Sequence, residues 1–283
     1  MIIDTHTHFG KPSEPNELLH RTALPDVYMP LASGEGVTGT IVVEARRGLD
    51  EIQWLLDMAE ENPFIVGIVG DIDLGSEDFG DALRRFVGSP TFLGVRLHDA
   101  CCYGSTRLLD ANSTTESSKL LRNAGNLAAN DLELDVHMSH ESIDGLIRVV
   151  KCLPDLRVVI NHIAEGNKPL SEEKANPRWA EAMYRVAESS SVYCKVSGLV
   201  QMTRTVPAPQ GVDYYRPTLD VLWEAFGEDR LVYGSNWPQI EAVSDFGTAH
   251  QIVASYFGEK GDEASQKFFW KNAKAVYRFV ART

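Results

Sequence analysis

The sequence is short of cysteine, of long apolar runs and of basic residues, and each shortage argues against a class of protein. Its 283 residues include four cysteines, at positions 101, 102, 152 and 194, without CxxC or zinc-finger spacing. We therefore expect reduced, partly buried thiols. No apolar stretch reaches the ~18 residues of a membrane helix, and the mean hydropathy is only −0.19. A membrane-spanning protein is therefore not expected.

Basic residues are outnumbered, and this limits the partners. The formal net charge of −13 argues against binding to a phosphate backbone or an anionic membrane, which needs clustered lysine and arginine. The opening segment MIIDTHTHFG has no basic region before its apolar residues, so no secretory signal is predicted. We expect a cytoplasmic protein that acts on a small molecule, with a homodimer as the default assembly.

Short apolar, β-branched runs alternate with helical patterns along the whole chain. Eight such runs are predicted as strands: 1–4, 39–45, 64–72, 92–98, 132–138, 156–163, 191–199 and 230–237. Apolar strands that alternate with helices indicate a parallel sheet covered on both faces. Eight repeats in 283 residues favour one (β/α)8 barrel over 1–283. The alternative, a doubly wound sheet, would need a GxGxxG turn, which DTHTHFGKP lacks.

Ionisable and polar residues recur near the ends of these strands. His6 and His8 lie two apart on the first strand, so both side chains face the barrel lumen. The other strand-associated residues are Glu44, Arg96, His137, His162, Lys195 and Asn236. Such groups are costly on apolar strands unless they are paired, hydrogen-bonded or bound to metal. Their recurrence predicts an active site at the mouth of the barrel.

The order of motifs resembles the amidohydrolase superfamily, and within it the amidohydrolase-2 group of sugar-lactone and 2-pyrone-4,6-dicarboxylate lactonases. The likeness spans nearly the whole chain and includes HTH, GVR, NH, VYCKVSGL and GEDRLVYGSNWP. It implies hydrolysis of a sugar-acid or carboxylated ring lactone by an activated water. A metal-dependent decarboxylase, as in related barrels, is the alternative enzyme.

The resemblance also implies roles for particular residues. His6, His8, His137 and His162 match a metal or substrate-polarising set, and Zn²⁺ is the first guess for the metal, although a metal-free site is also consistent. Arg96 would hold a substrate oxygen or carboxylate. Lys195, Arg204, Arg46 and Arg47 are candidates for anion binding. Tyr103, Arg107, Arg204 and Tyr214, in long loops, could close over a ligand.

Asn236 departs from the family motif GSDWP, in which an aspartate occupies its position. An amide cannot take a proton near neutral pH, so Asn236 cannot serve as general base. Three explanations stay open: an engineered trap for the substrate, a natural site in which another residue serves as base, or a non-catalytic sugar-acid binder. His162, His137 and Glu44 are the candidate bases, and a histidine qualifies only when it does not bind a metal.

Overall fold

A computed structural model describes residues 1–10, 22–45, 48–99, 109, 114–164, 175–203 and 205–280, with the side chains of 114–116 left aside. Eight strands form one sheet in the order β1 to β8, and every neighbouring pair is parallel. The strands are β1 Ile3–Thr7, β2 Gly39–Val43, β3 Ile65–Gly70, β4 Phe92–Asp99, β5 Glu133–Met138, β6 Val158–Ile160, β7 Val192–Val196 and β8 Leu231–Tyr233. The (β/α)8 prediction is confirmed.

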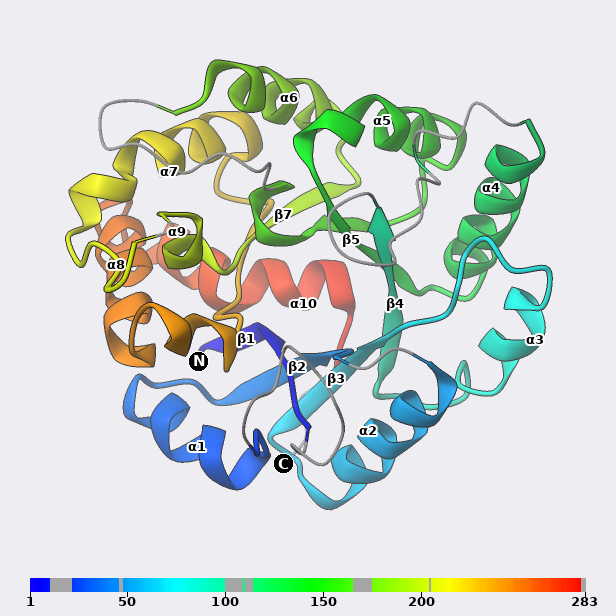
Figure 1. Cartoon of the computed structure of the whole chain (residues 1–283), viewed down its shortest axis with the longest axis horizontal. Helices are drawn as coiled ribbons and strands as arrows, with labels where there is room; N and C mark the ends of the chain where they lie inside the picture. The colour runs from blue at the N-terminus through cyan, green and yellow to red at the C-terminus, as the bar shows by residue number, and fades with distance from the viewer. Residues whose placement is uncertain are drawn as a thin grey trace.

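Helices surround the sheet, as Figure 1 shows in a view along the barrel. They are α1 Pro25–Gly34, α2 Leu49–Glu61, α3 Phe79–Arg84, α4 Thr114–Ala129, α5 Ile143–Cys152, α6 Pro177–Ala187, α7 Val212–Phe226, α8 Phe246–Glu259, α9 Asp262–Gln266 and α10 Asn272–Tyr277. Shorter helical turns are η1 His140–Ser142, η2 Asn161–Ala164, η3 Leu199–Thr203, η4 Gln239–Ala242 and η5 Lys267–Lys271, the last a π-helix. None of the described helices is long and apolar enough to cross a membrane.

Each outer helix packs through one apolar stripe. In α5 the buried apolar side chains are Ile143, Leu146, Val149 and Val150, which follow the helical repeat. The strands are buried on both faces because helices cover the outside and side chains fill the lumen.

The barrel closes between β1 and the segment that follows β8. The backbone N–H of His8 donates to the carbonyl of Trp237 at 2.9 Å, and that of Asn236 donates to the carbonyl of His6 at 2.9 Å. The segments that carry the first histidines and Asn236 therefore lie side by side.

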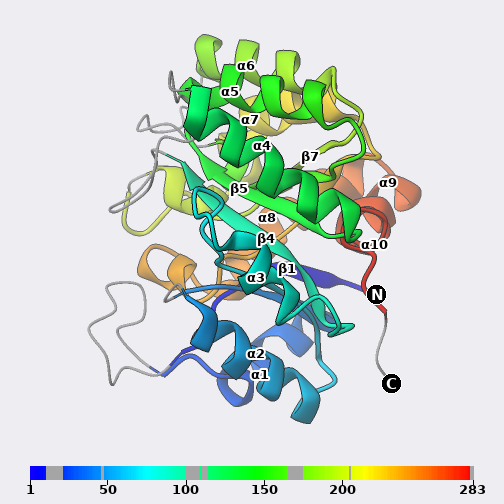
Figure 2. The same cartoon turned by 90° about the vertical axis from the view of Figure 1, so that its right-hand side faces the viewer.

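The C-terminal helix α10 closes the amino-terminal end of the barrel. Figure 1 shows α10 across the middle of the ring, and Figure 2 shows it at the end where the N-terminus lies. Val276, Tyr277 and Phe279 share an apolar cluster with Ile3 and Val232 from the strands. This packing leaves the opposite end, where the strands finish, for the site.

The residues of β4 and β5 that face the lumen form three successive layers. The pairing of β4 with β5 sets Gly94 beside Glu133, Arg96 beside Asp135 and His98 beside His137. Alternate residues of a strand face the same side, so these three pairs follow one another from the bottom of the barrel to its mouth.

Every strand differs from its predicted extent by at least one residue, and β1, β6 and β8 are examples of the larger differences. The first lies at Ile3–Thr7 rather than 1–4, and β6 and β8 end at Ile160 and Tyr233. The chain leaves the extended conformation because His162, Ile163 and Ala164 have φ of 49°, 53° and 50°, and Asn236 has φ of 66°. A β-branched residue such as Ile163 is rarely found there, and strain of this kind concentrates at functional sites.

Gly94 should be required for the β4–β5 pairing. A methyl group at Gly94 would collide with the backbone oxygen and the carboxyl group of Glu133. We expect Gly94→Ala to lower the free energy of unfolding by about 1–3 kcal/mol or more, measured by urea denaturation. Gly88→Ala is the matched control, because no described heavy atom lies within 4 Å of an added methyl there. Equal losses in both variants would contradict the layered packing.

Candidate active site

The predicted site residues gather at the carboxyl ends of the strands. His6, Arg96 and His137 lie within β1, β4 and β5. The residues His8, Glu44, His162 and Asn236 follow the ends of their strands by one to three positions. The structure thus brings together side chains from β1, β2, β4, β5, β6 and β8, as the sequence predicted.

The two histidines of the HTH motif face each other. Their Nε2 atoms are 3.2 Å apart, and Nδ1 of His8 lies 3.0 Å from the carbonyl oxygen of Val43. A carbonyl only accepts, so Nδ1 of His8 carries the proton and its Nε2 presents a lone pair. Burial lowers the pKa of His8 to about 4, and Arg96 adds to this effect. Burial also holds the pKa of His6 well below its usual value.

Glu44 binds two cationic or donor groups. Its Oε1 lies 3.3 Å from Arg96 Nη1 and also contacts His98 Nε2 at short range. Burial alone would raise the pKa of Glu44, but the hydrogen bond from His98 and the charge of Arg96 lower it to about 2. Glu44 is therefore ionised and only weakly basic. His98 was not among the residues predicted from the sequence, although its position two residues after Arg96 was a signal.

His162 has partners on both ring nitrogens. Nε2 lies 3.3 Å from Arg96 Nη2, and Nδ1 lies 2.8 Å from the hydroxyl of Ser197. A guanidinium only donates, so Nε2 accepts from Arg96 and Nδ1 donates to Ser197. Burial, with His137 and Arg96 nearby, holds the pKa of His162 well below its usual value. Ser197 was also missed, although it lies two positions beyond Lys195 on the same strand face.

His137 completes the cluster of imidazoles. Its ring centroid lies 5.0 Å from that of His162 and 5.4 Å from that of His98. The expected position of His137 at the mouth of the barrel therefore agrees with the structure.

Asn236 is held by the side chain of Gln201, which was not among the residues predicted from the sequence. Its Nδ2 donates to Gln201 Oε1 at 2.7 Å. Its Oδ1 is buried and makes no hydrogen bond within the described part of the chain. Asn236 also lies close enough to His8 to raise the pKa of that ring. Gln201 lies in η3, where no pattern in the sequence marked it.

Lys195 does not have the surroundings expected of an anion-binding residue. Its ammonium is fully buried and donates to Asp135 Oδ2 and to the carbonyl of Thr5, both at 2.8 Å. Tyr277 donates to the other oxygen of Asp135 at 2.7 Å. Because these groups occupy the ammonium, Lys195 supports the site from the layer below. We therefore replace the substrate-binding assignment of Lys195 with a structural one.

Several expectations fall outside the described residues. These are the anion-binding roles of Arg46, Arg47 and Arg204 and the loop contacts of Tyr103 and Arg107. Tyr214 lies in α7, with its ring 5.2 Å from that of Tyr215. Of the cysteines, Cys194 is buried with a raised pKa and Cys152 is an exposed free thiol.

The described donors do not complete a metal site. The 3.2 Å between the Nε2 atoms of His6 and His8 matches the roughly 3.3 Å edge of a tetrahedral zinc site with Zn–N bonds of ~2.0–2.1 Å. Two imidazoles therefore fit. Over the described ranges, however, no group of three or more His, Cys, Asp or Glu side chains could hold a metal ion. Both nitrogens of His162 are engaged, and Asn236 offers a neutral amide instead of a carboxylate.

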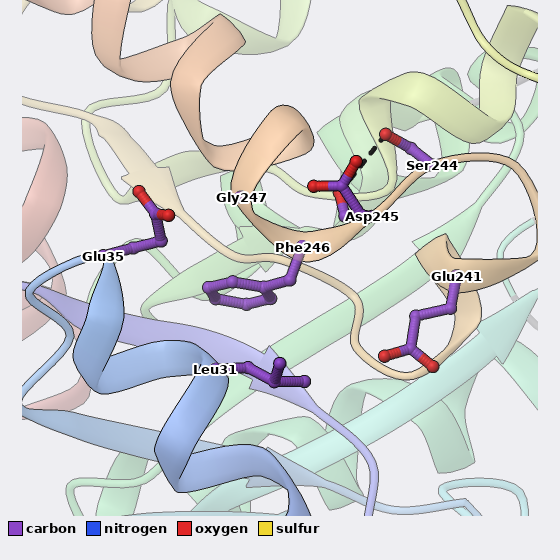
Figure 3. Close-up of a pocket in the computed structure, with 7 residues that line it drawn as sticks. All are labelled: Leu31, Glu35, Glu241, Ser244, Asp245, Phe246 and Gly247. Atoms are coloured by element: carbon purple, nitrogen blue, oxygen red, sulfur yellow. Dashed lines mark hydrogen bonds between the residues drawn. The ribbon is translucent and has the colours of Figure 1, made fainter.

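A separate hollow of about 540 Å³ lies between the end of α1 and the start of α8 (Figure 3). Leu31 and Phe246 form its apolar side, and three carboxylates surround it. Each carboxylate already has a partner: Glu35 accepts from Gln251, Glu241 from Trp237, and Asp245 caps α8. We assign no ligand to this hollow.

Comparison with known proteins finds relatives over almost the whole chain. A sequence model described as amidohydrolase matches residues 3–279. The L-fucono-1,5-lactonases of Burkholderia ambifaria and Burkholderia multivorans are 29% and 25% identical, and the matches cover 98% and 96% of this chain and 95% and 94% of those proteins.

Solved structures share the fold. An amidohydrolase from Burkholderia multivorans, with bound HEPES, has a TM-score of 0.83 at 24% identity over 99% of this chain and 100% of that one. A second crystal form, with bound zinc, has a TM-score of 0.81 at 23% identity over the same shares.

Removing the buried ammonium should destabilise the protein. We expect Lys195→Met to lower the free energy of unfolding by about 3–5 kcal/mol, because Asp135 would keep an uncompensated buried charge. Adding Asp135→Asn should recover part of the loss, because it removes that charge and keeps an acceptor for Tyr277. Urea denaturation measures both values. A loss under about 1 kcal/mol in the single variant would show that the pair does not support the site.

Proposed function

This chain belongs to the amidohydrolase family, and we propose that it opens a lactone ring by hydrolysing the ring ester bond. Two relatives that align over nearly the full chain are L-fucono-1,5-lactonases, which favours a sugar-acid lactone as substrate. The observation that carries the proposal is the convergence of His6, His8, Arg96 and His162 at the ends of three strands.

Arg96 is suited to bind the lactone carbonyl or a substrate carboxylate. Its guanidinium lies at the level of the histidines, where it contacts Glu44 and His162, and its Nε makes no hydrogen bond to a described residue. A guanidinium in a buried site stabilises negative charge that develops on the carbonyl oxygen when water attacks. Arg96 therefore serves as the electrophilic group of the proposed reaction.

His8 is the best-placed proton acceptor. Glu44, the only carboxylate among the predicted bases, has a pKa of about 2 and is engaged by Arg96 and His98. The lone pair of His162 is engaged by Arg96. His8 has its Nδ1 proton anchored on Val43, and its pKa of about 4 leaves Nε2 unprotonated near neutral pH. The group within hydrogen-bond distance of that Nε2 is the imidazole of His6 at 3.2 Å, which burial keeps neutral, rather than a guanidinium. This arrangement presets the tautomer that a general base requires.

The proposed hydrolysis needs only the lactone, one water molecule and His8 as the proton carrier. The oxygen of a water molecule bonds to the lactone carbonyl carbon while one of its protons passes to Nε2 of His8. The carbon–oxygen bond of the ring then breaks, and the proton returns from His8 to the departing ring oxygen. The product is the open hydroxy acid. Asn236 cannot take the proton, but its Oδ1 can accept a hydrogen bond from the attacking water.

A divalent metal is a separate part of the proposal. The Burkholderia multivorans amidohydrolase contains zinc, which favours a divalent metal here, and the 3.2 Å between the Nε2 atoms of His6 and His8 suits two of its ligands. Since only two described side chains would hold it, we expect weak binding, and no step above uses a metal. The decarboxylase alternative has no additional support from the described site.

Lactone turnover should depend on Arg96. We expect the wild-type chain to hydrolyse at least one aldono-1,5-lactone of a panel, measured by acid release in a pH-stat. Arg96→Met should lower kcat/KM about 10²–10³-fold, as expected when one stabilising donor is removed. The control is Arg216→Met, which removes an exposed arginine of α7 paired with Glu259. No hydrolysis of any lactone, or binding without turnover, would overturn the proposal, and CO₂ release from an aromatic acid would favour the decarboxylase.

The pH profile should identify the base. We expect kcat/KM of EDTA-treated enzyme to fall only as the pH decreases through about 4, the pKa of His8. His8→Gln should reduce kcat about 10²–10⁴-fold. If kcat/KM instead fell near pH 2, the base would be Glu44. If it fell near pH 6.5, the base would be a solvent-exposed histidine. Zinc analysis of the same samples is the check on His8, because stoichiometric zinc that survives EDTA would contradict its role as a free base.

A further inference from the structure

The amide of Asn236 is the third member of a series of hydrogen bonds that begins at a backbone carbonyl and passes through the side chain of Gln201. Gln201 Nε2 donates to the carbonyl oxygen of Gln239 at 3.2 Å, and Gln201 Oε1 accepts from Asn236 Nδ2 at 2.7 Å. Gln239 begins η4, three residues after Asn236, so the chain of bonds spans the turn that follows β8.

The backbone carbonyl of Gln239 determines the donor-to-acceptor direction of these hydrogen bonds. A backbone carbonyl can only accept, so the NH₂ group of Gln201 must face it. The carbonyl of the Gln201 amide then faces position 236, and the residue there must donate. Asparagine satisfies this requirement through Nδ2, whereas an aspartate carboxylate would set two acceptors against each other.

The backbone restricts both side chains. Gly198 has φ of +61°, and a Cβ there would lie 3.0 Å from Gln201 Oε1 and 3.2 Å from Asn236 Nδ2. The backbone N–H of Gln201 donates to the carbonyl of Gly198 at 2.9 Å, which fixes the turn that carries Gln201. The backbone of Asn236 is in the left-handed region, which asparagine tolerates better than most residues. The pair therefore has little freedom to rearrange.

We propose that Gln201 is a positioning residue that selects an amide at position 236 and keeps its Oδ1 directed into the site beside His8. The amide of Asn236 is thus the state for which this site is built, rather than a damaged version of an acid. The catalytic part of this inference rests on the proposed lactonase activity. The structural part, the selection of a donor at position 236, does not.

A double-mutant cycle tests the structural part. At pH 8 in EDTA, Asn236→Asp should lower Tm by about 4 °C or more, because the carboxylate meets Gln201 Oε1. In the Gln201→Leu background, which lacks that carbonyl, the same change should lower Tm by less than half as much. The control cycle uses Gln53→Leu, an exposed glutamine of α2 bonded to Asp57, and should be additive. Equal Tm losses for Asn236→Asp in both backgrounds of Gln201 would overturn the proposal.

Kinetics test the positioning role. Gln201→Leu should lower kcat about tenfold to a hundredfold with little change in KM, because Asn236 loses its fixed orientation. Gln201→Glu should lose less kcat than Gln201→Leu, since one carboxylate oxygen can again accept from Nδ2, although the other would face the carbonyl of Gln239. Equal kcat losses in both variants would contradict positioning. If the wild-type chain hydrolyses no lactone, the proposed function fails, whereas the Tm cycle still decides the selection of the amide.

Discussion

The buried ion pair between Lys195 and Asp135 is the interaction on which the site depends. It lies in the middle of the lumen, where Lys195 also donates to the carbonyl of Thr5 and Asp135 accepts from Tyr277. A buried charge is costly unless it is paired and fully hydrogen-bonded. By meeting that requirement, the pair joins β1, β5, β7 and the C-terminal helix, and the charge of Lys195 contributes to lowering the pKa of His6.

Above this pair, burial determines the protonation of the site. The histidines of β1 and His162 are kept neutral because burial and the neighbouring guanidinium of Arg96 disfavour their charged forms. The hydrogen bond from His98, together with the same guanidinium, keeps the pKa of Glu44 low despite burial, so Glu44 stays ionised. The site therefore combines a fixed cation, a neutralising carboxylate and neutral imidazoles. In such surroundings a neutral amide at position 236 adds a hydrogen-bond acceptor without another charge.

Much of the fold and part of the site could be predicted from the sequence. The alternation of apolar strands and helical stripes gave the barrel, and the strand-end positions of His6, His8, Arg96 and His162 were visible from their spacing. The predicted ends of β6 and β8 lie several residues beyond the observed ones. The left-handed backbone at 162–164 and 236 ends these strands, and no pattern of apolar residues marks it. Gln201 had no signal at all, since its role depends on a carbonyl in another turn.

The sequence by itself determined the eightfold repeat, the face on which each strand residue lies and the absence of an ionisable group at position 236. These follow from local periodicity and residue chemistry. Only the tertiary structure decided the partners: Lys195 with Asp135 across 60 residues, and Asn236 with Gln201 across 35. Such pairs depend on distances of about 3 Å between separate strands and turns. Those distances are set when the barrel closes and brings the ends of its strands together.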